Sequence, residues 1–89
     1  MVKGIVGVSS EGPRGPAYVR FSHEPLARTE PWERDDTLMV DYDAAGEIVG
    51  IELVVLSPGA MNGLLELARL KGLDLSALVA HSFLVSPAT

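Results

Sequence analysis

Two β-prone runs separated by three small residues restrict the fold of this chain more than any other feature. Residues 38–43 alternate between apolar and polar side chains, residues 47–55 are rich in β-branched residues, and Ala-Ala-Gly lies between them. A three-residue hairpin loop is usually a type I turn followed by a residue of positive φ, which glycine adopts without steric strain. The pattern therefore predicts a β-hairpin whose turn depends structurally on Gly46.

Uninterrupted alternation across that turn sets the expected register. Tyr42 then faces Ile48, and Val40 faces Gly50, because successive side chains of a strand point to opposite faces. One face carries Leu38, Val40, Tyr42, Ile48 and Val54, and the other carries Asp41, Asp43, Glu47, Val49, Ile51 and Leu53. Since both faces are largely apolar away from the turn, we expect the sheet to be covered on both sides.

Further strands are predicted before the hairpin. Residues 2–8 and 17–22 are rich in β-formers, and residues 9–16 between them hold two prolines and two glycines, which indicates a loop. Residues 23–36 contain two prolines and many charges, so we expect a loop there with at most a short extended piece at 27–29. These strands and the hairpin predict an antiparallel meander in chain order.

A helix is predicted after the last strand. Ser57 is a favoured N-cap residue, Pro58 suits the first helical position, and Gly72 is a typical stop. The apolar residues between them recur at helical spacing. Asp74 or Ser76 is suited to cap a second short helix.

The length of the chain fits one domain. For 89 residues we predict a single α+β domain, 1–89, in which an antiparallel four-stranded β-meander (1–56) is followed by one or two C-terminal helices (the helical tail, 57–85). Domains this small are often stabilised by disulfides, metals or self-association. The chain has no cysteine, which excludes disulfides, thiolate metal sites and cysteine nucleophiles. A hydrophobic content of 47% is high for such a chain and favours self-association.

Charge argues against nucleic-acid binding. The net charge is −5, with seven basic residues scattered among twelve acidic ones, whereas binding a phosphate backbone requires clustered Lys and Arg. The apolar run at 51–56 is interrupted by Glu52 and is too short to span a bilayer, so no membrane association is expected. Because the N-terminus resembles no signal peptide, we expect a cytoplasmic protein.

Three carboxylates near the hairpin turn are the candidate metal ligands. Asp41, Asp43 and Glu47 share one face in the predicted register, and carboxylate oxygens suit Mg²⁺ or Ca²⁺. The alternative, which we favour, is a solvated hairpin tip. Glu52 interrupts an apolar strand on the predicted face of Val40 and Tyr42, and Arg20 is its expected structural partner in an ion pair.

The two histidines, the loop at 9–16 and Trp32 do not form a recognisable catalytic or ligand-binding motif. His23 and His81 are unpaired in sequence, and residues 9–16 lack the spacing and lysine of a phosphate-binding loop. Trp32 either packs on the sheet or anchors a partner, and we favour packing. We therefore predict no catalytic residues and no cofactor.

The middle of the chain resembles the domain of unknown function 2283 family. Residues 18–53 contain Tyr-Val-Arg-Phe-Ser, Arg-Thr-Glu, and Val-Asp-Tyr-Asp followed by Gly and Val-Gly-Ile-Glu-Leu, which are similar to the family's "YIRLS", "TEEV" and "VDYDxxGxxVGIEIL" segments. The Gly/Pro loop at 9–16 and the helical tail depart from the family pattern. The resemblance implies a β-meander and provides no catalytic residues. Some members of the family are found beside toxin-like partner proteins, which suggests an antitoxin-like role.

These observations favour a non-enzymatic, homo-oligomeric interaction module, most simply a homodimer through the helical tail. One alternative is a small-ligand or metal-binding domain or minor enzyme using the three carboxylates. Another is an antitoxin-like partner of a small basic protein. The predicted dimer interface consists of Met61, Leu64, Leu65, Leu67, Leu78 and Phe83.

Overall fold

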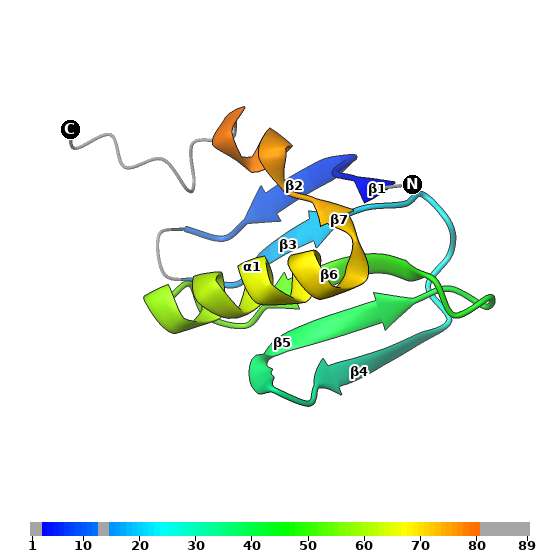
Figure 1. The fold of residues 1–89 in the computed structure, drawn as a ribbon, viewed down its shortest axis with the longest axis horizontal. Coiled ribbons are helices and arrows are strands. Elements are labelled where there is room, and N and C mark those ends of the chain that lie inside the picture. The colour runs from blue at the N-terminus through cyan, green and yellow to red at the C-terminus, as the bar shows by residue number, and fades with distance from the viewer. Residues whose placement is uncertain (1–2, 13–14, 81–89) are drawn as a thin grey trace.

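A curved five-stranded sheet carries one long helix against one of its faces (Figure 1). The computed structural model describes residues 3–12 and 15–80. The elements are β1 (Lys3–Gly4), β2 (Gly7–Ser10), β3 (Ala17–Arg20), β4 (Arg28–Trp32), β5 (Asp35–Tyr42), β6 (Ile48–Leu53), α1 (Pro58–Lys71), β7 (Leu73–Asp74) and a 3₁₀ helix (Ser76–Ala80). Within these residues, no helix is both long and apolar enough to cross a membrane.

The α+β class is confirmed, whereas the predicted strand order is wrong. The sheet is antiparallel throughout, with the order β2-β3-β6-β5-β4. β3 pairs with β6 rather than with β5, because β4 occupies the outer edge of β5. β4 lies inside the segment predicted as a loop. Its residues are mostly exposed and include Pro31, which an edge strand tolerates, so it has neither the alternation nor the composition of a buried strand.

The hairpin turn forms as predicted. Gly46 has a φ of 83°, and its backbone N–H donates to the Asp43 carbonyl at 3.0 Å. The Asp43 side chain also stabilises the turn, since its Oδ1 accepts hydrogen bonds from the backbone N–H groups of Ala45 and Glu47, each at 2.9 Å. A short polar side chain at the start of a turn commonly makes such bonds.

A bulge changes the register beyond the turn. Tyr42 pairs with Ile48 as predicted, but Asp41 pairs with Gly50, which leaves Val49 as the extra residue of β6. Val40 therefore faces Ile51 instead of Gly50. The predicted faces are corrected accordingly: Leu38 and Val40 lie on the same side as Ile51 and Leu53, and Glu52 lies on the opposite side.

The core lies between α1 and this apolar side of the sheet. The Ser57 hydroxyl accepts from the Ala60 N–H at 3.0 Å at the start of α1, and Gly72 ends the helix with a φ of 69°, so both predicted boundaries are confirmed. The buried cluster consists of Ala17, Val19, Phe21, Leu38, Val40, Ile48, Ile51, Leu53, Ala60, Leu64, Leu67, Ala68, Leu73 and Leu78.

Most of the residues predicted to form a dimer interface belong to this core. Leu64 and Leu67 lie on the buried side of α1 and are at most 1% exposed, and Leu78 is 3% exposed. Met61 packs against the same cluster. Only Leu65, at 57%, is largely exposed, and Phe83 lies outside the described residues. α1 and the segment after it thus bury most of these side chains, whereas Leu65 and Leu70, at 57% and 47%, remain exposed.

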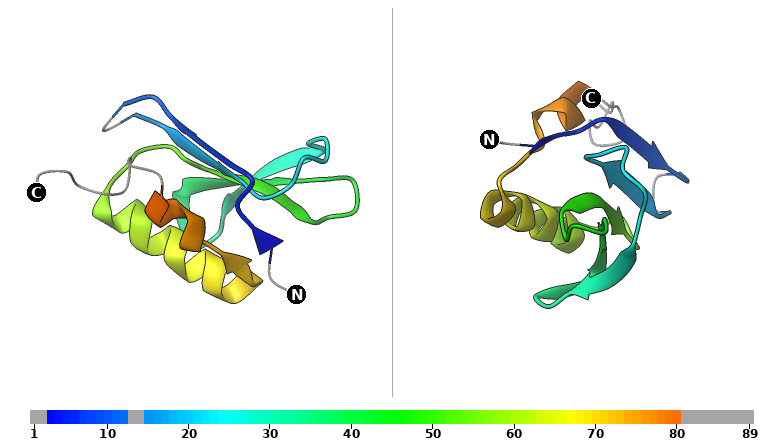
Figure 2. Two further views of the ribbon diagram at one scale, coloured as in Figure 1. Left: turned by 90° about the horizontal axis from the view of Figure 1, so that it is seen from above. Right: turned by 90° about the vertical axis from the view of Figure 1, so that its right-hand side faces the viewer.

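The first predicted strand is divided in two. Residues 3–4 form β1, which runs parallel to β7 after the end of α1, with Lys3 opposite Leu73. Residues 7–10 form β2, at the edge of the main sheet beside β3. Figure 2 shows the N-terminal segment passing from the end of α1 to the sheet. This arrangement ties the N-terminus to the C-terminal end of the helix.

Candidate functional site

The sheet face turned away from α1 is polar, and we call it the open face. The cross-strand register places two rows of residues there, since directly paired residues share a face. The first row is Ser9, Tyr18, Glu52, Met39 and Pro31, and the second is Gly7, Arg20, Gly50, Asp41 and Thr29. No helix within residues 3–12 and 15–80 covers this face (Figure 2), so the expected cover on both sides of the sheet is not found.

A hydrogen-bonded network crosses four strands of the open face. Tyr18 on β3 reaches over β6 and donates its hydroxyl to Asp41 Oδ2 on β5 at 2.7 Å. Thr29 on β4 donates its hydroxyl to Asp41 Oδ1. Both carboxylate oxygens of Asp41 are therefore engaged, and the side chain is held in one orientation.

Gly50 makes the path of Tyr18 possible. A Cβ atom at this position would lie 2.1 Å from the Tyr18 hydroxyl oxygen and 2.4 Å from Cζ, far inside van der Waals contact. The phenol ring thus lies directly across the backbone of β6. Glycine inside a strand often marks such a close approach, and this is the signal by which the sequence could have shown the network.

The environment of Tyr18 favours its neutral form. Burial, the hydrogen bond to Asp41 and the charge of Asp41 all raise the pKa of Tyr18 far above its usual value, and Arg20 offsets only part of this. The hydroxyl therefore stays a proton donor across the physiological range. At physiological pH this neutral phenol, hydrogen-bonded to a carboxylate, fixes the positions of both side chains.

The structure does not bring the three candidate metal ligands together. Asp41 is engaged by Tyr18 and Thr29, and Asp43 is engaged by the backbone of the turn. Glu47 is 69% exposed, with an oxygen 3.9 Å from Lys3 Nζ. Across residues 3–12 and 15–80, no group of three or more His, Asp or Glu side chains is arranged to hold a metal ion.

The predicted ion pair between Arg20 and Glu52 does not form among the described residues. Arg20 donates from Nε to the Ser22 carbonyl at 2.7 Å and from Nη2 to the Glu24 carbonyl at 3.3 Å, which fastens the segment after β3. Register explains the difference, because Arg20 pairs with Gly50 while Glu52 pairs with Tyr18. Both residues nevertheless lie on the open face, in neighbouring rows.

Within the described residues, Trp32 and His23 take no part in the network of the open face. Trp32 is half-buried on β4 and packs against the core, with the Arg34 guanidinium 5.9 Å from its ring centroid, as the packing interpretation expects. His23 is exposed after β3. His81 and part of the loop at 9–16 lie outside the described residues.

Residues 17–57 match the model of a family described as "Protein of unknown function (DUF2283)", which confirms the resemblance seen in the sequence. Neither a curated protein nor a solved structure shows significant similarity to the chain. The matched segment contains all four participants in the network, which are Tyr18, Thr29, Asp41 and Gly50. The motifs that carried the resemblance thus contain the residues of this network.

Proposed function

We propose that the chain is a non-enzymatic interaction module that forms a homodimer through the open face, since residues 17–57 carry the family match and also contain the Tyr18–Asp41–Thr29 network of this face. The observation that carries the proposal is the Tyr18–Asp41–Thr29 network, which fixes an otherwise uncovered set of side chains in one arrangement. A surface that is ordered before binding loses less conformational entropy when a partner arrives.

The side chains of the open face suit a protein interface. Tyr18, Arg20 and Met39 are all partly exposed there, and Tyr, Arg and Met are residue types enriched in protein–protein interfaces. The neutral Tyr18 phenol presents an apolar ring without a charge to desolvate. The face therefore offers both an aromatic centre and charged groups beside it.

The charges of the open face favour a second copy of the chain as the partner. Arg20 and Glu52 have opposite charge and form no direct ion pair with each other within the described residues. A two-fold axis brings each residue of one copy against the corresponding surface of the other, so a face that carries both signs can complement itself. Two reciprocal Arg20–Glu52 contacts would orient such a dimer.

Light scattering after size exclusion, at tens of micromolar protein, tests this proposal. We expect a dimer for the unmodified chain, a monomer for Glu52→Arg, and recovery of the dimer when Arg20→Glu is added to Glu52→Arg. Leu65→Ser is the control, because Leu65 is exposed on α1, on the other side of the sheet, and its replacement should leave the dimer intact.

A monomeric unmodified chain would contradict the proposal. A dimer that Leu65→Ser dissociates and Glu52→Arg leaves intact would move the interface to the helix. Circular dichroism of each variant establishes that a change in mass reflects association and not unfolding.

A further inference from the structure

Both lysines of the chain line the same hollow, although they are 68 positions apart in a sequence of net charge −5. The hollow measures about 220 Å³ and lies where the end of α1 and the β1–β7 pair approach the hairpin. The parallel pairing of Lys3 with Leu73 brings the N-terminus there. The residues that matter here are Lys3, Lys71, Tyr42, Glu47, Ile48 and Leu73.

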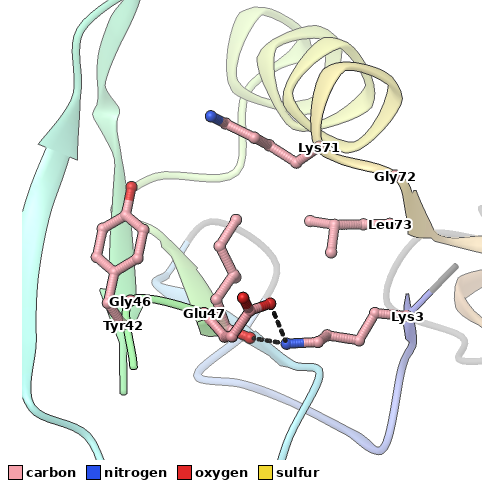
Figure 3. A pocket seen from close by; sticks show the side chains of 8 residues that line it. Lys3, Tyr42, Gly46, Glu47, Lys71, Gly72 and Leu73 are labelled. Atoms are coloured by element: carbon pink, nitrogen blue, oxygen red, sulfur yellow. Dashed lines mark hydrogen bonds and ion pairs between the residues drawn. The ribbon is translucent and has the colours of Figure 1, made fainter. Parts of the chain in front are cut away.

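The hollow has a cationic rim. Lys71 has no ion-pair partner in the part of the chain that the structure describes, and Figure 3 shows its ammonium on the side toward which the Tyr42 hydroxyl points. Lys3 Nζ donates to the Ile48 carbonyl at 2.9 Å and keeps further N–H groups. The Arg28 guanidinium lies 4.3 Å from the Tyr42 ring centroid, but its Nε is paired with Glu30 Oε2 at 2.7 Å, so it adds little net charge to the hollow.

The negative charge at the hollow is weakly held. Glu47 Oε1 lies 3.9 Å from Lys3 Nζ, which is at the limit of an ion pair, and its side chain is 69% exposed. An exposed pair of this kind contributes little stability. The carboxylate of Glu47 can therefore turn into solvent, and an incoming anion can take its place beside Lys3.

The floor of the hollow is apolar. Ile48 and Leu73 are each 8% exposed, and Leu73 projects between Lys3 and Lys71 in Figure 3. Ligand sites commonly combine an apolar lining with a few polar groups that fix orientation. This hollow is smaller than the usual ~300–1,000 Å³ of such sites, which restricts the ligand to a small molecule.

We propose that the hollow binds a small organic carboxylate, whose negative charge is attracted by Lys3 and Lys71 on the rim and whose hydrocarbon part lies on Ile48 and Leu73. The Tyr42 hydroxyl is placed to donate a further hydrogen bond to the anion. The proposal is independent of the homodimer, because the hollow shares none of its lining residues with the open face.

Titration of the full chain with benzoate, followed by amide chemical shifts in nuclear magnetic resonance spectra, tests the proposal. We expect saturable shifts concentrated at β1, β7, the end of α1 and residues 46–48. Lys71→Gln and Lys3→Gln should each weaken binding about three- to tenfold, which corresponds to the loss of one partly exposed charge-assisted hydrogen bond.

Arg69→Gln is the matched control, because it removes the same charge from the last turns of α1 without touching the hollow. It should leave benzoate binding within about twofold, as expected for a screened surface charge. Benzamide, which has the same ring without the charge, should produce no saturable shifts at these positions.

Three results would overturn the proposal: equal benzoate affinity for Lys71→Gln and the unmodified chain, an equal loss for Arg69→Gln, or equal binding of benzamide. Inorganic phosphate, which is an anion without a hydrocarbon part, distinguishes the contribution of the two lysines from that of the apolar floor. Binding of phosphate tighter than that of benzoate would overturn the role of the apolar floor, and weaker binding of phosphate supports it.

Discussion

The two faces of the sheet are built from the same strands, and they are stabilised by different forces. On the face beneath α1, alternate residues of β3, β5 and β6 are buried aliphatic side chains such as Val19, Leu38 and Ile51, each at 0% exposure. On the open face, the intervening residues include Tyr18 and Asp41, which are joined by a hydrogen bond across the strands. The face beneath α1 stabilises the fold by burying apolar area, and the open face holds polar side chains in a fixed arrangement.

The two faces differ in how strongly they depend on the exact side chain. The free energy gained by burying apolar side chains is proportional to the area removed from water, so several aliphatic residues could occupy each core position. The open face depends on a single path, in which Tyr18 crosses Gly50 to reach Asp41. We therefore expect the core face to dominate stability and the open face to be more sensitive to the exact residue at each position.

The largest effect is expected for Leu64→Ala, which leaves a cavity between α1 and the sheet. Leu64 is 0% exposed, and such truncations typically cost about 2–5 kcal/mol of the free energy of unfolding. Leu65→Ala, one position along the same helix and 57% exposed, should change it by less than about 0.5 kcal/mol. Urea denaturation of both variants measures the difference, and equal costs would contradict the assignment of the faces of α1.

A smaller but specific effect is expected for Gly50→Ala. The new methyl group must displace the Tyr18 ring, and overpacking of this kind costs about 1–3 kcal/mol. Gly7→Ala is the matched control, because Gly7 lies in the same row of the open face and a Cβ there meets only Arg20 Cβ, at 4.0 Å. It should be neutral within about 0.5 kcal/mol.

A double-mutant cycle shows whether the clash is the cause. When Tyr18→Ala removes the ring, adding Gly50→Ala should cost at least about 1 kcal/mol less than it does in the unmodified chain. Additive costs would mean that Tyr18 does not lie across Gly50.

The smallest effect is expected for Tyr18→Phe, which removes one hydroxyl from the network. The loss of its hydrogen bond to Asp41 should cost about 1 kcal/mol near neutral pH. Because folding raises the pKa of Tyr18 above its ordinary value of 10.0, the unmodified chain loses stability as the pH rises past that value, and Tyr18→Phe lacks this loss.

The difference in stability between the two chains should therefore narrow above about pH 10, the ordinary pKa of tyrosine. Tyr42→Phe is the control, since it keeps Tyr18 and with it the alkaline loss that Tyr18 causes. Urea denaturation at neutral and alkaline pH measures the free energy of unfolding of the unmodified chain and both variants. A difference between the unmodified chain and Tyr18→Phe that widens with pH would contradict the neutral, hydrogen-bonded state of Tyr18.

Local chemistry explains what could be predicted from the sequence. The turn at Gly46, the N-cap at Ser57 and the helix end at Gly72 all depend on positive φ or capping within a few residues, and all three are present. The α+β class followed from the same signals. The segment resembling the family also lay within the residues that match its model.

The pairing of distant segments was decided only by the tertiary structure. β3 joins β6 instead of β5, and the exposed segment 28–32 becomes an edge strand, although no local pattern distinguishes it from a loop. The entropy of closing a loop depends only weakly on its length, so nearness in sequence does not select the partner of a strand. The bulge at Val49 then changes which residues of β5 and β6 share a face.

The two proposed sites arise from that pairing. Tyr18 meets Asp41 only because β6 brings Gly50 between them, and Lys3 lines the same hollow as Lys71 only because β1 pairs with β7. The sequence by itself determined where the hairpin turns and where the helix begins and ends, because those choices are made by neighbours along the chain. The tertiary structure decided which side chains meet, because that depends on which distant strands can pair while burying their apolar sides under α1.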